Sequence, residues 1–571
     1  MKKTVRKSKS VSSIQKSSIS LLDKWNKKIQ SIQERNLLIV FLLLTLVVDI
    51  LNFNMKISEA HDDALYIEAA YRFIHEFPNY FYTANAPLYP LFLATLMKLF
   101  GFKLYIFKAF NILFHLGTVY FMFQTFKKII APVFFVFVML FLSINYLMVY
   151  FSSMTFTEQM FMFIQSGLFY FMSQVILNEE NIKVQNNNNK LFDVKNILLL
   201  ALFVFLLNIT RNISVSVLPA VLIFMYFLKS YRKKILLFLG SYAALQILFK
   251  LLIKIIWGAA STNQYGSQSK ILLQKDPYDA TQGYDNWWGF IERFFGNTEL
   301  YFSKRFFQIL GLKDELNTNT NMFIPIIMWV LIFWAIWVSF KDRKYLITFV
   351  GLYILALLSS TFLVLQTRWD QPRFVLIAMP SMMILYFYLI EKYFKSVIMR
   401  NISFILVLVL STSLMISNIK RTVQNFPVFL KNLNGDIYYG YTPDWINFLK
   451  ASEWCGNNLP PEAYVASRKA PMSFIYGKRK FFPIYSVIKK DPETNQSNPD
   501  SALIFFQQNK VTHILMPRLR IDPTKNTGQY INTIDNILEP IQNKYPNKLK
   551  LIHTEGEVEP CYVFEFVYDA K

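Results

Sequence analysis

The chain has 571 residues, of which 54% are hydrophobic, and it contains 56 Phe and 32 Tyr. Its mean hydropathy is positive, which exceeds what the core of a soluble domain requires and argues against a water-soluble globular protein. The formal charge of +23 would suit a nucleic-acid-binding protein, but the basic residues cluster in short hydrophilic gaps between apolar runs. We therefore interpret the charge as a sign of membrane topology and expect no nucleic-acid partner.

The first 35 residues contain ten Lys and Arg, and this segment is too long and too polar for a cleavable signal peptide. We expect residues 1–35 to be a cytoplasmic segment and residues 36–420 to be a membrane module. A spanning helix needs about 20 apolar residues. Eleven apolar runs lie at 36–53, 105–126, 129–150, 156–177, 196–210, 212–228, 235–257, 321–340, 345–366, 373–393 and 402–418. We predict about eleven transmembrane helices, with the short fifth and sixth runs either spanning the membrane or forming a re-entrant hairpin.

Basic residues mark one side of the predicted bundle. Outside the N-terminal segment they are Lys127, Lys128, the run 229-KSYRKK-234, the run 341-KDRK-344, Lys392, Lys395 and Arg400. Cytoplasmic loops carry an excess of Lys and Arg, so this side is predicted to face the cytoplasm. Strict alternation then places the loops 54–104 and 258–320, together with residues 421–571, on the outer face.

Residues 421–571 are predicted to form a soluble extracytoplasmic domain of the α/β class. Its expected elements are an amphipathic stretch from Pro443 to Trp454, apolar runs near Val465 and at His513–Met516, and a final strand at Cys561–Val567. The domain also contains the two cysteines of the chain, Cys455 and Cys561, which form either a disulfide or two separate core thiols.

Three carboxylates on the outer side are candidates for chemistry. Asp62 and Asp63 open an amphipathic helical stretch just outside the membrane, where they act either as an N-terminal cap or as functional acids. Glu158 lies at the outer start of the fourth apolar run, with uncharged apolar sequence on both sides. An ionisable group at a membrane boundary usually faces a cavity or a partner, which favours a functional role for Glu158.

Three arginines complete this outward-facing set of acids and bases. Arg211 lies at the outer end of the fifth run, and Arg368 and Arg373 lie in 367-TRWDQPRF-374. The alternative for Arg373 is a side chain that snorkels to the lipid headgroups. A guanidinium also binds phosphate in a bidentate manner, so acids beside these cations suggest group transfer from a lipid phosphate.

The order of these motifs resembles that of C-type (GT-C) glycosyltransferases, which are polytopic enzymes that use polyprenyl-phosphate sugars. The first outer loop carries the resemblance in 62-DDALYIEAA-70 and 86-APLYPLFLATLMKLFG-101, and the order continues through Glu158, Arg211 and 373-RFVLIAMPSMMIL-385. It is closest to the branch that includes protein O-mannosyltransferases and lipid A aminoarabinose transferases, and it covers the membrane half of the chain. The resemblance implies a GT-C-like helical module followed by the C-terminal domain.

The resemblance also implies roles for the charged residues. One carboxylate of the first loop, with Asp62 ranked before Asp63, would act as general base on the acceptor hydroxyl. Glu158 would orient the acceptor or contribute to a metal site. The three arginines would neutralise the leaving polyprenyl phosphate and so lower the barrier to its departure.

Aromatic residues of the outer loops are expected to contact the acceptor. In the first loop these are Tyr66 and Tyr89. In 276-DPYDATQGYDNWWGFIERFFGNTE-299 they are Trp287 and Trp288, which form either a membrane anchor or a lid that stacks on the sugar or the acceptor.

No cofactor is established by the sequence. A divalent metal ion shared between neighbouring carboxylates stays open, with His61 and His75 as further candidate ligands.

The sequence thus predicts an integral membrane glycosyltransferase of the cytoplasmic membrane. It would transfer a sugar from a polyprenyl-phosphate donor to a lipid, glycan or protein acceptor on the outer face. The alternative is a polytopic transporter or lipid flippase, because helices with intramembrane Arg and Glu also describe substrate pathways. Against that alternative, the charged residues lie at the outer mouth of the bundle and not at the midplane. The sequence contains no P-loop and no HExxH motif, which argues against an ATP-driven protein and a metalloprotease.

Overall fold

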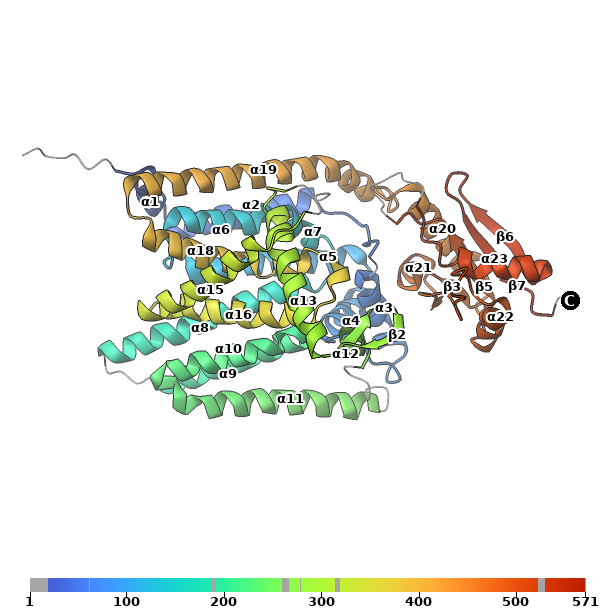
Figure 1. The fold of residues 1–571 in the computed structure, drawn as a ribbon, viewed down its shortest axis with the longest axis horizontal. Helices are drawn as coiled ribbons and strands as arrows, with labels where there is room; N and C mark the ends of the chain where they lie inside the picture. The colour runs from blue at the N-terminus through green and yellow to red at the C-terminus, as the bar shows by residue number, and fades with distance from the viewer. Residues whose placement is uncertain are drawn as a thin grey trace, which may run out of the picture.

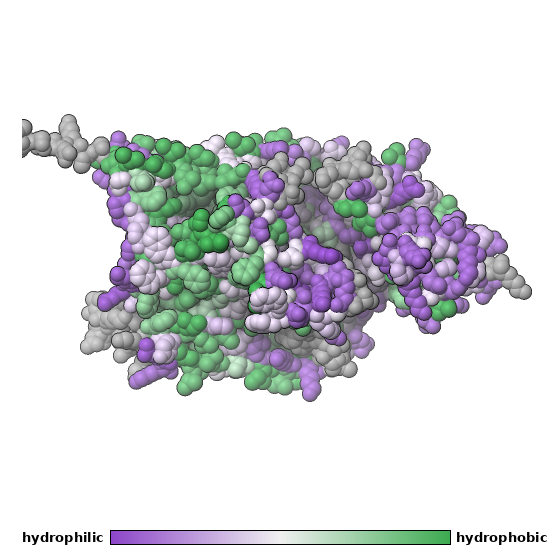
Figure 2. Space-filling model, in the orientation of Figure 1, coloured by the Kyte–Doolittle hydropathy of each residue, from purple (hydrophilic) through white to green (hydrophobic). Residues whose placement is uncertain are grey.

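The computed structural model describes residues 19–60, 62–185, 190–258, 266–277, 279–313, 319–521 and 529–569. Long helices lie side by side in a bundle, and the C-terminal sheet lies beyond one end of that bundle (Figure 1). Figure 2 shows that the surface of these two parts differs. Hydrophobic side chains cover much of the bundle, and hydrophilic side chains cover the C-terminal part. A lipid-facing surface needs such a band, because lipid offers no hydrogen-bond partners to polar groups.

Each predicted apolar run falls on one or two helices, since a helix satisfies all backbone groups of a segment internally. These helices are α2 (Glu34–Leu51), α5 (Leu104–Phe126), α6 (Pro132–Ile144), α7 (Tyr146–Ser152), α8 (Glu158–Gln185), α9 (Lys190–Thr210), η1 (Asn212–Ser216), α10 (Val217–Phe227), α11 (Ile235–Trp257), α15 (Phe323–Lys341), α16 (Tyr345–Val364), α17 (Arg373–Leu376), α18 (Met379–Tyr393) and α19 (Val397–Leu433). The connecting elements are α1 (Leu21–Gln30), η2 (Lys229–Lys234) and η5 (Thr367–Trp369).

The chain is a multi-pass membrane protein, but the predicted count of eleven spans is not confirmed. Six of the described helices are long and apolar enough to cross a membrane, or seven if α6 and α7 form one span bent by 44°. The apolar part of α9 and the unit of η1 with α10 are shorter, at 10–17 residues. Helix α2 has 18 residues, but it contains the charged side chains of Glu34, Arg35 and Asp49.

The basic turns predicted to share one side do meet at one end of the bundle. Lys127 and Lys128 pair with Glu34 at N–O distances of 2.6 and 3.1 Å. Lys392, at the end of α18, pairs with Asp342, which follows α15. Segments that are far apart in sequence are therefore close together at this end, which the charge pattern predicts to be the cytoplasmic one.

The two predicted outer loops contain regular structure. The first holds α3 (Asp62–His75) and α4 (Leu88–Phe100), which pack against each other. The second holds α12 (Gly266–Leu273), the antiparallel strands β1 (Gln274–Asp276) and β2 (Asp279–Tyr284), α13 (Trp287–Leu300), the π-helical turn η4 (Tyr301–Arg305) and α14 (Phe306–Ile309). Helix α3 also packs against α21 of the C-terminal part, so it lies between the bundle and the sheet.

The C-terminal part is a mixed sheet with helices, which confirms the predicted α/β class. Its strand order is β4–β3–β5–β7–β6, with parallel pairing of β3 to β4 and β5 and antiparallel pairing of β7 to β5 and β6. The strands are β3 (Val465–Ser467), β4 (Phe481–Pro483), β5 (His513–Pro517), β6 (Leu549–Glu555) and β7 (Cys561–Phe566), and the helices are α20 (Pro443–Asn458), α21 (Ala470–Gly477), α22 (Pro499–Gln508), α23 (Asp535–Lys544) and η6 (Pro546–Lys548).

The predicted elements of this part correspond to α20, β3, β5 and β7. Cys455 on α20 and Cys561 on β7 are buried and are not joined, so they are two separate core thiols. Helix α19 continues past residue 420 to Leu433 and leads from the bundle into this part.

Candidate active site

Four charged residues from the ends of four helices meet at the end of the bundle that faces the C-terminal part. Asp62 begins α3, Glu158 begins α8, Arg373 begins α17, and Arg211 directly follows α9. Arg373 donates to Asp62 at 2.6 Å, and its Nε lies 3.9 Å from the Glu158 carboxylate. Glu158 also accepts a hydrogen bond from Arg211 at 3.0 Å. Acid and base therefore alternate along one continuous cluster.

Burial differs sharply within this cluster. The side chain of Glu158 is 1% exposed and those of Arg211 and Arg373 are each 14% exposed, whereas Asp62 is 38% exposed. Only the Asp62 side of the cluster is therefore widely open, and a substrate would reach that carboxylate first.

The buried part of the cluster has unused hydrogen-bonding capacity. Within the described ranges, Glu158 Oε2 and Arg373 Nε are buried without a hydrogen-bond partner. The Arg373 guanidinium also lies 5.2 Å from the ring centres of Phe156 and Phe374, which hold it in a fixed plane. A buried polar atom without a partner is costly, so these two atoms are positioned to receive a ligand group.

Asp63 has a different environment from Asp62, although the two are adjacent. It is fully buried, and its carboxylate accepts hydrogen bonds from the backbone amides of Ser58 and Ala64 at 2.9 and 3.0 Å. Burial raises the pKa of Asp63, against the opposing effects of the Ser58 amide and the nearby Lys108 ammonium. Asp63 thus holds the segment that precedes α3, while Asp62 pairs with Arg373.

The two tyrosines predicted to contact the acceptor form a buried wall beside the cluster. Tyr66 packs edge-to-face on Tyr82 and Tyr89, and Tyr89 hydrogen-bonds Asn111 at 3.1 Å. Burial, followed by the Asp62 charge, raises the pKa of Tyr66 to about 12, so its hydroxyl stays protonated and available as a donor. Asn85 already donates to that hydroxyl at 3.3 Å.

Three predicted site residues are not brought to the cluster. Arg368 is 65% exposed and pairs with Asp276 of β1 instead of with Asp62 or Glu158. Trp287 and Trp288 begin α13 and are 73% and 65% exposed, so neither packs against the charged residues. Their exposure suits an aromatic membrane anchor and equally a lid, and the choice between these two predictions stays open.

The sequence analysis did not identify a second group of cations close to Arg373. Lys304 and Arg305 of η4 bind the Asp370 carboxylate at 2.7 and 2.6 Å, and Asp370 lies three residues before Arg373. The available signal was the acid inside 367-TRWDQPRF-374, which needs a cationic partner from elsewhere in the chain. Nothing local shows that this partner lies about 65 residues earlier.

Arg305 also lines a cavity of about 400 Å³ between α7, α14, α19 and the segment that follows α2. Lys56 and Arg421 supply two further cations, Pro372 links the wall to Arg373, and no carboxylate is among the described lining residues. The cavity is therefore suited to an anionic group placed next to the Asp62 cluster.

The carboxylates do not form a metal site in this arrangement. In the described part of the chain, no group of three or more His, Cys, Asp and Glu residues is placed to hold a metal ion. Arg373 bridges Asp62 and Glu158, so a guanidinium occupies the position that a shared cation would take. His75 stacks on the Tyr71 ring at 3.9 Å, and His61 lies outside the described residues.

Comparison with known proteins identifies the fold. No family model and no curated protein sequence matches the chain. Among solved structures, ArnT from Cupriavidus metallidurans bound to undecaprenyl phosphate matches with a TM-score of 0.57 at 11% identity, over 94% of this chain and 98% of that one. Archaeal oligosaccharyltransferase AglB from Archaeoglobus fulgidus, in complex with an inhibitory peptide and a dolichol-phosphate, matches with a TM-score of 0.52 at 11% identity, over 87% of this chain and 70% of that one.

The Archaeoglobus fulgidus enzyme was also solved in complex with Zn and sulfate, and that structure matches with a TM-score of 0.51 at 12% identity, over 84% of this chain and 67% of that one. ArnT and AglB are members of the GT-C superfamily. The GT-C fold that the motif order implied is therefore confirmed, and identities this low establish the fold alone.

Proposed function

We propose that this chain is an integral membrane glycosyltransferase that moves a sugar from a polyprenyl-phosphate donor to an acceptor hydroxyl on the outer face of the membrane. The observation that carries the proposal is the Asp62–Arg373–Glu158–Arg211 cluster at the open end of a GT-C bundle. ArnT bound to undecaprenyl phosphate and AglB in complex with a dolichol-phosphate have the same fold, which supports a lipid-phosphate donor.

Asp62 is the proposed general base. Arg373 occupies Oδ2 of this carboxylate, which leaves Oδ1 to accept the proton of the acceptor hydroxyl. As the acceptor oxygen bonds to the anomeric carbon, the bond from that carbon to the donor phosphate breaks, and the electron pair leaves with the phosphate. Removing a positioned base typically costs a factor of 10² to 10⁴ in rate.

Arg373 and Arg211 are the proposed phosphate ligands. The leaving phosphate gains negative charge as the bond breaks, and fixed guanidinium groups stabilise that charge without reorganising. The buried Glu158 carboxylate holds both arginines in place, because it lies within 4 Å of each. Oε1 of Glu158 thus positions the two arginines, and the unpaired Oε2 is left to accept a hydrogen bond from a ligand. Arg368 is no longer needed for the proposal.

The 400 Å³ cavity beside Pro372 is the proposed site for a second phosphate-bearing group. Its cations, Lys56, Arg305 and Arg421, would hold an anionic group of the acceptor, because Arg373 and Arg211 hold the donor phosphate. We expect Arg305→Gln to raise KM for the ligand that binds there while it leaves the fold intact, because the Asp370 carboxylate keeps Lys304 as a partner.

The deciding experiment is consumption of radiolabelled polyprenyl-phosphate sugars by purified protein with a membrane extract as the source of acceptor. Wild type is compared with Asp62→Asn and Glu158→Gln, and Glu565→Gln on the C-terminal sheet serves as a matched control that removes a carboxylate far from the cluster. Wild type and the control should consume one donor, and Asp62→Asn should lose at least about a hundredfold in rate.

Equal turnover by wild type and Asp62→Asn would remove Asp62 as the base. If no donor is consumed and labelled lipid instead crosses reconstituted vesicles, the protein is a flippase and the proposal fails. The position of the cluster at one end of the bundle argues against that alternative, because transporters place their charged sites near the midplane.

A further inference from the structure

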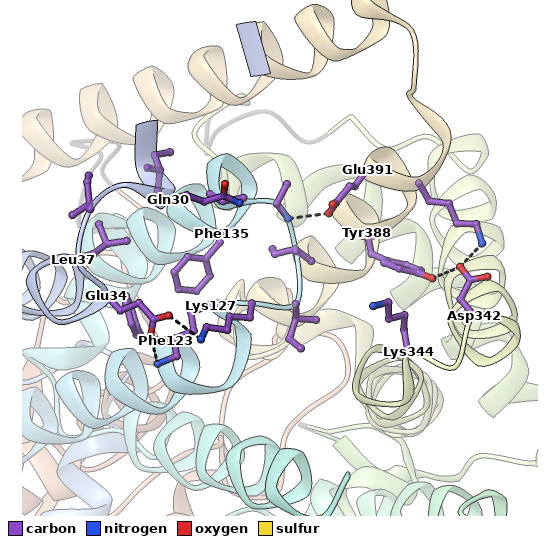
Figure 3. A pocket seen from close by; sticks show the side chains of 18 of the residues that line it. Gln30, Glu34, Leu37, Phe123, Lys127, Phe135, Asp342, Lys344, Tyr388 and Glu391 are labelled. Atoms are coloured by element: carbon purple, nitrogen blue, oxygen red, sulfur yellow. Dashed lines mark hydrogen bonds and ion pairs between the residues drawn. The ribbon is translucent and has the colours of Figure 1, made fainter. Parts of the chain in front are cut away.

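A second cavity lies at the opposite end of the bundle from the Asp62 cluster (Figure 3). It has a volume of about 770 Å³ and is lined by the end of α1, the start of α2, the turn between α5 and α6, the turn between α15 and α16, and the end of α18. The Asp62 cluster lies at the start of α8 and of α17, so the length of the helices separates the two sites. None of the proposed catalytic residues is among the described residues that line this cavity.

Charged side chains ring the cavity, and positive charge is in excess. Five lysines and three carboxylates line it: Lys127, Lys128, Lys344, Lys392, Lys395, Glu34, Asp342 and Glu391. The lining therefore carries a surplus of two positive charges, which favours an anionic occupant.

The three carboxylates already have partners within the protein. The pairs are Glu34 with Lys127 and Lys128, Asp342 with Lys392 and the Tyr388 hydroxyl, and Glu391 with the Ala131 amide. These pairs fix the walls of the cavity. Two lysines share Glu34, and the extra positive charge there offsets the charge of Glu391, whose partner is a neutral amide. The net surplus therefore equals the charges of Lys344 and Lys395.

Lys344 and Lys395 are the cations available to a ligand. The Lys344 ammonium forms no hydrogen bond or ion pair with any described residue, and in Figure 3 it points into the cavity. Among the described residues, the ammonium of Lys395 donates only to the backbone carbonyl of Glu391, at 2.8 Å. An ammonium bound to a neutral carbonyl gains more from an anion, because a charge-assisted hydrogen bond is roughly twice as strong.

The wall on the α2 side of the cavity is apolar. Leu37 lines the cavity, and about one and two turns further along α2 the side chains of Val40 and Leu43 are 57% and 56% exposed, as on a lipid-facing helix. Phe123 and Phe135 extend the apolar lining on the side of α5 and α6. A ligand that combines an anionic head with hydrocarbon chains matches both features.

The N-terminal segment of the chain does not have the properties expected of a ligand for this cavity. Residues 1–18 contain six Lys and Arg and no acidic residue, so this segment would be repelled by the lysines of the cavity. An external anion is needed to balance the surplus charge.

We propose that this cavity binds the phosphodiester headgroup of one anionic phospholipid from the adjoining membrane leaflet, with Lys344 and Lys395 as its ligands and the acyl chains lying along α2. Basic pockets between membrane helices are suited to such headgroups, and each lysine near an anionic lipid contributes about fivefold in affinity. This site is independent of the glycosyl-transfer chemistry at the other end of the bundle.

The test is native mass spectrometry of delipidated protein titrated with dioleoyl phosphatidylglycerol, with dioleoyl phosphatidylcholine as the uncharged comparison. Wild type should bind one phosphatidylglycerol in preference to phosphatidylcholine. The double variant Lys344→Gln/Lys395→Gln should lose about thirtyfold in affinity, while Lys344→Arg/Lys395→Arg should retain binding. A matched control, Lys24→Gln/Lys341→Gln, removes two exposed lysines from the same end of the protein outside the cavity and should bind like wild type.

The proposal is overturned if wild type shows no preference for the anionic lipid, or if the matched control loses as much affinity as the cavity variant. Glycerol phosphate is the competitor that separates a lipid site from a soluble phosphate site. Displacement of the lipid by millimolar glycerol phosphate would assign the cavity to a soluble phosphate compound and would also overturn the proposal. Unchanged thermal unfolding of the double variant confirms that lost binding is not lost folding.

Discussion

Neighbouring aspartates at the start of α3 have different physical roles. Asp62 pairs with Arg373 at the edge of the bundle, whereas Asp63 turns inward to two backbone amides. Successive residues at a helix start point in different directions, so only one of an adjacent pair can reach a given site. The first outer loop therefore supplies one proposed base and one structural carboxylate.

We predict that Asp63→Asn lowers stability more than it lowers turnover per folded molecule. The asparagine oxygen can accept from only one of the Ser58 and Ala64 amides, which bind different oxygens of Asp63, and the substitution also removes the negative charge that faces Lys108. Asp62→Asn should do the opposite and reduce turnover at nearly unchanged stability. Thermal unfolding in detergent and donor consumption, measured on both variants, separate the two roles, and the same pattern in both variants would contradict the assignment.

The side chain of Lys469 is predicted to make the stability of the protein depend on pH. Its ammonium is largely buried and donates to the Glu59 carbonyl at 2.8 Å, and burial lowers its pKa from 10.5 to about 8. Between about pH 8 and 10.5 the unfolded chain then holds more protons than the folded one at this residue. Its contribution to stability therefore rises with pH across that window.

Comparison of Lys469→Met with wild type isolates this contribution. The difference in unfolding temperature between them should shift in favour of wild type as pH rises from 7 to 10. A difference that is constant over this range would show that the folded lysine titrates normally.

At the scale of elements, the break between α6 and α7 is held by buried polar residues. His115 of α5 contacts Asp49 of α2 through Nδ1 and the Leu142 carbonyl through Nε2, both at 2.8 Å, and Ser152 donates to Asp49 at 2.7 Å. Since a carbonyl only accepts, Nε2 must carry a proton. The chain runs from this break through α7 to Glu158 at the start of α8. The network therefore fixes the segment that leads to Glu158.

We predict that His115→Leu destabilises the protein by about 3–5 kcal/mol, because it leaves the Asp49 carboxylate buried without its partner. The double variant Asp49→Leu/His115→Leu should recover part of that loss, since an apolar pair replaces the ionisable one. Thermal unfolding of the two single variants and the double variant measures the coupling. Strictly additive losses would mean that the two side chains do not act as a unit.

At the scale of the whole molecule, the C-terminal part clamps the segment that leads into α3. The Tyr441 hydroxyl accepts from the Ile57 amide at 2.5 Å and donates to the Ile57 carbonyl at 2.9 Å. Lys56 in turn donates to the Gly440 carbonyl at 2.7 Å. Because Asp62 follows this segment directly, the C-terminal part fixes the position of the proposed base.

Tyr441→Phe should therefore loosen the first outer loop without unfolding either part. We expect faster hydrogen exchange at residues 55–60, and turnover reduced about three- to tenfold, because two hydrogen bonds of about 1 kcal/mol each are lost. Hydrogen exchange followed by mass spectrometry localises the change. Exchange that increases evenly over the whole sheet would instead indicate a role in folding of the C-terminal part.

Local sequence patterns were sufficient to predict the elements and their grouping. Apolar runs, the basic turns between them, the helix beginning at Asp62 and three strands of the C-terminal sheet all follow from local periodicity and charge, which act over a few residues. The motif order also led to the GT-C fold. The number of spans did not follow from the sequence. Whether a short apolar helix crosses the membrane depends on the helices that pack around it and not on its own length.

Which residues share a site depends on contacts between segments that are far apart in the sequence. Arg373 and Asp62 are separated by 311 residues, and Arg305 and Asp370 by 65, so no local pattern indicates either contact. The same packing directs Arg368 to Asp276 and turns Asp63 away from Asp62. Side-chain direction at a helix end depends on the neighbours that the fold supplies, and it is this direction that separates a site residue from a structural one.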